Sequence, residues 1–189
     1  MDWLATLLAG RPRQRSDLHW QRRQSAPDEL WLVIVDASAS TRRHQALSDA
    51  KGLLAELFDR SYRQRARLAL LTASGSRPSW QCHGLKASGA LRDWLQALGA
   101  GGGTPLSAAV DEARRWLAKR RRQHPNEAPQ CWLLTDGRLK DIAAFSPLGC
   151  PTVLIDIEQG PIRLGRARQL AQTLDARYQA MGDLAIVGA

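Results

Sequence analysis

Apolar runs that alternate with helical patterns constrain the fold of this chain more than any other feature of its sequence. Four such runs, rich in leucine, valine and isoleucine, occupy 30–35, 68–72, 131–135 and 152–157. A strand that is covered on both faces has a continuous apolar run rather than an alternating one. Between these runs apolar residues recur with the helical period, most clearly across 41–60. Strands that alternate with helices predict an α/β fold, a doubly wound and mostly parallel sheet flanked by helices.

The remaining segments fit the same architecture. Further helical patterns lie at 88–98, 104–117 and 164–174, and a short helical segment is expected at 141–145. Residues 78–82 are expected to form one short antiparallel edge strand, because proline cannot donate to a sheet ladder and is best placed at a margin. A last short strand is expected at 177–180.

One globular domain is predicted. The 189 residues are enough to bury a core, and no internal repeat divides them. Residues 1–29 are polar and arginine-rich after a short amphipathic piece, so we expect them to form an N-terminal extension. The domain itself is predicted to span 30–189.

The chain is strongly basic, with a net charge of +9 at pH 7. Its basic residues cluster at 11–15, 22–23, 63–67 and 119–122. Most of this charge is interpreted as solvated helix surface, and the last cluster falls at an expected helix C-terminus, where cations are favourable. No zinc finger, helix-turn-helix or aromatic RNA-binding motif accompanies the clusters. The pattern therefore favours an acidic protein partner over a nucleic acid.

The sequence predicts a cytoplasmic protein that does not associate with membranes. Its apolar runs fall short of the roughly 20 residues that a membrane helix needs. An acidic residue, Asp2, comes before the first basic residue, Arg11, unlike the start of a secretory signal. Cys82, Cys131 and Cys150 lack metal-ligand spacing, so we expect reduced thiols.

Five oxygen-bearing side chains are placed to bind one divalent cation. They are Asp36, Ser38 and Ser40 after the first apolar run, Thr104 after three glycines, and Asp136 after the third run. Ligand sites of open parallel sheets form at the carboxyl ends of the strands. Carboxylate and hydroxyl oxygens suit Mg²⁺ or Mn²⁺, and no thiolate or imidazole set is present to attract a softer metal. With few anionic ligands, such a metal is expected to accept one more carboxylate from a partner.

Each of these residues also has an ordinary structural interpretation. Ser40 or Thr41 can serve as the N-cap of the helix that follows, and Thr104 is an ideal cap because Pro105 would take the first helical position. Asp136 and the glycine after it make a good turn pair. The convergence of all five residues on strand ends and a glycine-rich loop favours the metal site over these separate roles.

The motifs that would indicate an enzyme are weaker. The sequence contains no GxxxxGK[ST] phosphate loop and no GxSxG elbow, so neither ATP hydrolysis nor hydrolase chemistry is expected. One alternative stays open, a phosphotransferase that uses Asp36 as its nucleophile. Dehalogenase-like phosphatases, however, have a second aspartate where this chain has Ser38.

These motifs resemble the metal-ion-dependent adhesion site of von Willebrand factor A domains. The wider sequence is similar to the C-terminal A domain of the magnesium chelatase D subunit, over about Asp17 to Leu184. The segments that carry this likeness are 36–40, 50–52, 62–65, 101–106, 135–138, 154–156, 170–171 and 176–178. Ala39 and Thr41 depart from the family motif, which has a glycine and a methionine there, but neither position supplies a side-chain ligand.

The resemblance implies a Rossmann-like von Willebrand factor A fold and a non-catalytic, Mg²⁺-dependent interaction subunit. Such a subunit would serve a magnesium or cobalt chelatase that inserts its metal into a tetrapyrrole, for cobalamin or chlorophyll-type cofactors. The implied partners are an AAA+ ATPase and the large tetrapyrrole-binding subunit. The sequence lacks the AAA+-like part and the acidic linker of the D subunit. An adaptor for an unrelated, MoxR-like AAA+ ATPase is therefore the alternative.

Overall fold

The computed structural model of this chain describes residues 3–19, 28–37, 46–86, 94–95, 98, 105–139, 141–158 and 165–183. Three of the proposed metal ligands, Ser38, Ser40 and Thr104, lie outside these ranges. Most of the predicted helix at 88–98 also lies outside them, although Trp94 and Leu95 are helical.

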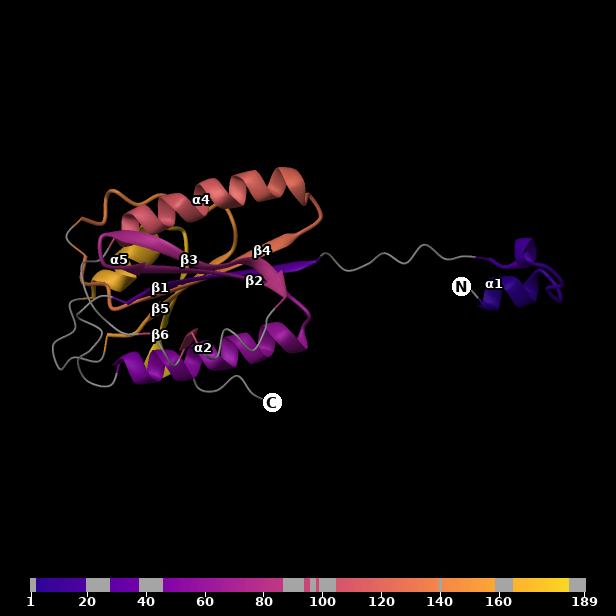
Figure 1. Cartoon of the computed structure of the whole chain (residues 1–189), viewed down its shortest axis with the longest axis horizontal. Coiled ribbons are helices and arrows are strands. Elements are labelled where there is room, and N and C mark those ends of the chain that lie inside the picture. Colours follow the sequence, from indigo (N-terminus) through magenta and orange to yellow (C-terminus); the bar gives the residue numbers. More distant parts are fainter. Residues whose placement is uncertain are drawn as a thin grey trace.

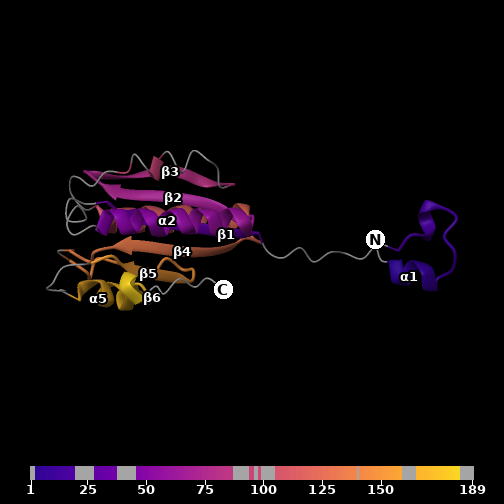
Figure 2. The same cartoon turned by 90° about the horizontal axis from the view of Figure 1, so that it is seen from below.

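A six-stranded sheet forms the centre of the protein, in the order β3-β2-β1-β4-β5-β6 (Figure 2). Its strands are β1 (Glu29–Asp36), β2 (Arg67–Ser74), β3 (Arg77–Lys86), β4 (Ala128–Thr135), β5 (Thr152–Asp156) and β6 (Arg177–Ala180). All neighbouring strands are parallel except β2 and β3, which are antiparallel. The predicted fold class, a mostly parallel sheet with one antiparallel edge strand, is confirmed.

Helices cover both faces of this sheet (Figure 1). They are α2 (Ala46–Arg63), α4 (Leu106–Gln123) and α5 (Arg166–Thr173). Successive residues of β1 point to opposite faces, as the pleat requires. Leu32 and Ile34 pack in one core cluster with α4 and α5, and Val33 and Val35 pack in the other with α2. Burial on both faces explains why the strand is an unbroken apolar run.

Two predicted elements differ from the structure. Residues 141–145 form a bend and a turn instead of a helix. There the carboxylate of Asp141 accepts a hydrogen bond from the backbone N–H of Ala143 at 2.9 Å, a local bond that competes with helix formation. Strand β3 is longer than the predicted 78–82, because it pairs with β2 along that strand's whole length. The predicted strand at 177–180 is confirmed as β6.

The first residues contain two short helical elements, α1 (Trp3–Leu8) and the 3₁₀ helix η1 (Arg15–Asp17). The buried hydroxyl of Thr6 accepts a hydrogen bond from the backbone N–H of His19 at 3.0 Å, which ties the two together. None of the helices in the described part of the chain combines the length and the apolar character needed to span a bilayer. The division of the chain between 29 and 30 stays a prediction.

Candidate metal site

Buried acidic side chains line the carboxyl ends of three adjacent strands, β1, β4 and β5. They are Asp36 (1% exposed), Asp136 (5%), Asp156 (5%) and Glu158 (6%). Asp36 is the last residue of β1, and Asp156 is the last residue of β5. Asp136 comes one residue after the end of β4, and Glu158 comes two residues after the end of β5. Burial of charge without a compensating partner is costly, so the contacts of each carboxylate indicate its role.

Thr135 links Asp36 to the loop that carries Asp136. Its hydroxyl donates to Oδ2 of Asp36 at 2.8 Å and accepts the backbone N–H of Gly137 at 3.1 Å. The pairing of β1 with β4 makes this possible, because Val35 lies opposite Leu134 and brings Asp36 level with Thr135. Thr135 is fully buried. Thr135 was not among the predicted site residues, although it directly precedes Asp136.

The loop after β4 is pressed against α5. Gly137 has φ +69°, a left-handed conformation that favours glycine. A Cβ placed there would lie 2.6 Å from the backbone nitrogen of Ala167. The glycine therefore allows the loop that carries Asp136 to approach the start of α5 closely.

Asp136 and Glu158 share one cationic neighbour, Arg138. The guanidinium Nε of Arg138 lies 3.8 Å from Oδ2 of Asp136, and its Nη2 lies 3.9 Å from Oε1 of Glu158. The backbone N–H of Arg138 also donates to Oδ1 of Asp136 at 3.1 Å. The residue thus contacts Asp136 through both its backbone and its side chain.

Asp156 has partners of its own. The phenol of Tyr178 on β6 donates to its Oδ2 at 2.7 Å, and the backbone N–H of Glu158 donates to its Oδ1 at 2.9 Å. These bonds fasten β6 and the loop after β5 to the end of the sheet. We assign Asp156 this structural role.

The structure brings Asp36 and Asp136 to adjacent strand ends, as the sequence predicted. Among the described residues, no three histidine, cysteine, aspartate or glutamate side chains come together as a metal-binding group. The predicted site contains only two carboxylates, so it depends on the hydroxyls of Ser38, Ser40 and Thr104. Hard oxygen donors of this kind fit Mg²⁺ or Mn²⁺.

The three cysteines are poor competitors for a cation. Burial raises the pKa of the Cys82 thiol to about 11 and the pKa of Cys131 well above its usual value. Burial also raises the pKa of Cys150. Neutral thiols are weak metal ligands, because the thiolate is the binding form. This agrees with a site built from oxygen donors.

Comparison with known proteins identifies the family. The family model of the von Willebrand factor type A domain matches residues 31–138, which is more than half of the chain. The match includes β1 to β4, except for the first two residues of β1. The chain belongs to the von Willebrand factor type A domain family. Its sheet order and flanking helices are those of the A-domain fold.

The A domain is also similar to part of a chelatase subunit. The magnesium-chelatase 60 kDa subunit of Rhodobacter capsulatus is 30% identical over 89% of this chain. The match covers 32% of that subunit, so the chain spans about a third of its length.

Solved structures share the fold at low sequence identity. The manganese-loaded TRAP protein of Plasmodium vivax is 18% identical, with a TM-score of 0.65 over 84% of this chain and 70% of that one. The proximal thread matrix protein 1 of the mussel byssus, whose metal-ion-dependent adhesion site holds zinc, is also 18% identical. Its TM-score is 0.61 over 85% of this chain and 43% of its own. Both metals belong to those proteins, and the likeness establishes the fold.

Proposed function

We propose that this A domain is a non-catalytic, Mg²⁺-dependent protein-interaction subunit of a cytoplasmic magnesium- or cobalt-chelatase assembly. The observation that carries the proposal is the pair of buried aspartates, Asp36 and Asp136, on adjacent strand ends, where Thr135 bonds both Asp36 and the loop after Asp136. The similarity to a chelatase subunit over most of the chain supports the choice of assembly. We further infer that 30–189 form the A domain and that 1–29 form an extension.

The proposed ligands are Asp36, Ser38, Ser40, Thr104 and Asp136. The two aspartates bring negative charge, and the three hydroxyls bring neutral oxygens. Bound there, Mg²⁺ or Mn²⁺ would supply an electrophilic position for a carboxylate of the partner. Thr135 and Gly137 would not bind the metal themselves. Their role is to position the strand end and the loop that carry Asp36 and Asp136.

The proposed partners are the AAA+ ATPase of the assembly and its large tetrapyrrole-binding subunit. Metal insertion and ATP hydrolysis are assigned to those subunits. An adaptor role toward an unrelated, MoxR-like AAA+ ATPase would use the same site and differ only in its partner. Identification of the ATPase that co-purifies with the chain distinguishes these two roles.

Calorimetric titration with Mg²⁺ and Mn²⁺ tests the site itself. We expect one site in the wild-type chain and none in Asp36→Asn, because the amide loses the charge yet can still accept the hydrogen bond of Thr135. Asp141→Asn is the matched control, since Asp141 is exposed and accepts a hydrogen bond within its own turn, from the backbone N–H of Ala143. Equal metal binding by wild type and Asp36→Asn would contradict the proposal.

A further inference from the structure

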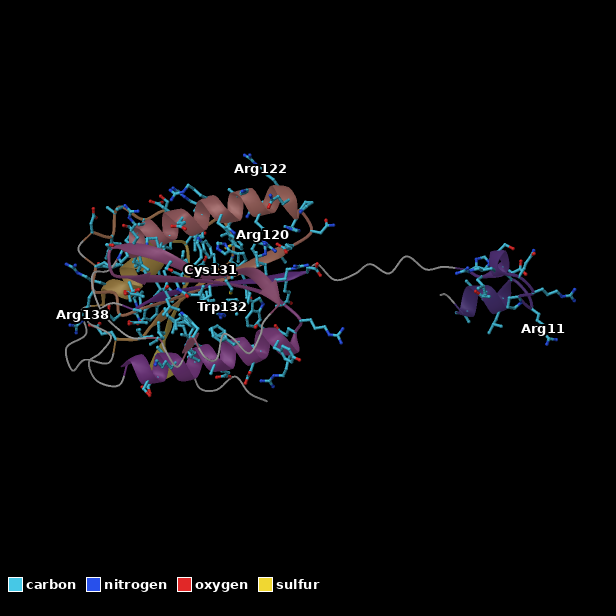
Figure 3. The ribbon with its side chains drawn as sticks, in the orientation of Figure 1. Arg11, Arg120, Arg122, Cys131, Trp132 and Arg138 are labelled. Carbon is cyan, nitrogen blue, oxygen red and sulfur yellow. The ribbon has the colours of Figure 1, made fainter. Side chains whose placement is uncertain are left out.

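Arg138 is a basic residue that lies directly beside the candidate metal site. Its side chain is 36% exposed, whereas the side chains of Asp136 and Glu158 that it faces are 6% and 2% exposed. One end of the site thus carries a cation that reaches solvent and two carboxylates that do not. In Figure 3, Arg138 lies at the opposite end of the domain from Arg120 and Arg122.

Two buried carboxylates near one another repel, and each loses hydration, so a shared counter-charge stabilises them. Arginine suits this role because its guanidinium stays charged at all physiological pH values. The positive charge of Arg138 already lies beside the carboxylate of Asp136, which a divalent cation would also bind. A cation bound through Asp136 would meet a resident positive charge.

Neighbouring arginines of α5 are engaged elsewhere. The guanidinium of Arg166 donates to the backbone carbonyl of Leu139, and that of Arg168 lies over the Tyr178 ring at 4.9 Å. Their contacts fasten α5 to the loop after β4 and to β6. Arg138, in contrast, faces carboxylates.

We propose that Arg138 is a resident counter-charge that competes with the divalent cation for Asp136 and so limits the metal affinity of the site. This inference rests on the proposed function, because it assumes that Asp136 is a ligand. Glu158 has the opposite influence, since it attracts the guanidinium of Arg138 away from Asp136. A weakened intrinsic affinity makes metal binding depend more strongly on the carboxylate that a partner would add.

Calorimetric titration of the full chain with Mg²⁺ or Mn²⁺ tests the competition. We expect Arg138→Gln to bind the metal roughly tenfold more tightly than wild type, because a charge about 4 Å from a ligand is removed in a partly buried site. Arg138→Lys keeps the charge and should stay near wild type. Arg122→Gln is the matched control, with the same change of net charge at the far end of the domain, and should stay within about twofold of wild type.

Thermal unfolding in EDTA gives a second readout that needs no bound metal. We expect Arg138→Gln to lower the Tm by a few degrees, because Asp136 and Glu158 lose their shared counter-charge. The double variant Arg138→Gln/Glu158→Gln should recover part of that loss, because it also removes one of the repelling carboxylates. Saturating Mg²⁺ should reduce the difference between Arg138→Gln and wild type.

The outcomes separate this inference from the proposed function. If wild type binds metal and Arg138→Gln binds it equally or more weakly, the competition is refuted and the metal site stands. If neither protein binds metal, the proposed function and the competition both fail. An Arg138→Gln variant as stable as wild type in EDTA would also refute the role of Arg138 as a counter-charge.

Discussion

At the scale of single residues, the site depends on a hydroxyl group that is not a proposed ligand. Thr135 donates to Asp36 and accepts from Gly137, so one side chain sets the position of both the β1 end and the loop after β4. A buried donor or acceptor that loses its partner retains the full cost of its lost hydration. Thr135 therefore contributes to stability as well as to the geometry of the site.

Replacement of this hydroxyl gives a stability prediction. Thr135→Val keeps the shape but removes the bonds to Asp36 and Gly137, and we expect a loss of about 2 kcal/mol in the free energy of unfolding. Thr135→Ser keeps the hydroxyl and should lose clearly less. Urea unfolding of the two variants measures the difference. If the valine variant is as stable as the serine variant, the hydroxyl does not support the site.

Some residues of the site were predictable from the sequence, and others were not. Asp36 and Asp136 were predictable, because each directly follows a recognisable buried strand. The contact of Arg138 with Glu158 was not, because the two residues are distant in sequence and meet only through the pairing of β4 with β5. The turn at 141–145 was missed because one local hydrogen bond, from the backbone N–H of Ala143 to the side chain of Asp141, outweighs a short helical pattern.

At the scale of elements, the fold depends on how closely the loop after β4 approaches α5. Periodicity predicted both the strand and the helix, since each has an apolar pattern of adequate length. It carries no information about the distance between them. That distance is set at Gly137, where a side chain would meet the backbone of Ala167.

Two glycines allow this approach to be measured. Gly137→Ala should cost about 2–4 kcal/mol, because it adds both a left-handed strain and an overlap with backbone atoms that cannot move aside. Gly149→Ala is the matched control, since its φ is +75° but the space around it is open, and it should cost only about 1–2 kcal/mol. Equal losses in chemical denaturation would show that the close approach is relaxed in solution.

At the scale of the whole molecule, Arg138, which contacts Asp136, and Arg122, in the basic cluster at the end of α4, lie toward opposite ends of the domain (Figure 3). Within the described residues, Lys119, Arg121 and Arg122 are exposed at the end of α4. Arg120 differs from them, because it forms two hydrogen bonds with Glu127 and lies over the Trp116 ring at 5.2 Å. Arg120 therefore serves the packing of α4. Arg121 also donates a hydrogen bond, to the backbone carbonyl of Gly149 at 2.7 Å, but like Lys119 and Arg122 it stays exposed. The charges of these three exposed residues can attract an acidic partner.

Because of this separation, we expect partner binding to depend on salt concentration and on the bound metal independently. Salt should slow association by screening the basic end, whereas EDTA should abolish the complex through the metal site. The double variant Lys119→Gln/Arg122→Gln should reduce the salt sensitivity of the association rate and leave metal affinity unchanged, and it keeps the hydrogen bond of Arg121 to Gly149. Surface-plasmon measurements across a salt series check this, and a changed metal affinity would contradict the separation.

The central claim, that a bound metal carries the protein interaction, is tested most directly by one pull-down with the proposed partner, a chelatase-type AAA+ ATPase. The tagged chain is compared with Asp36→Asn, in Mg²⁺ and in EDTA, with circular dichroism to establish that both proteins are folded. We predict that the wild-type chain captures the ATPase in Mg²⁺ but not in EDTA, and that Asp36→Asn captures it in neither. Undiminished capture in EDTA, or by folded Asp36→Asn, would contradict the account.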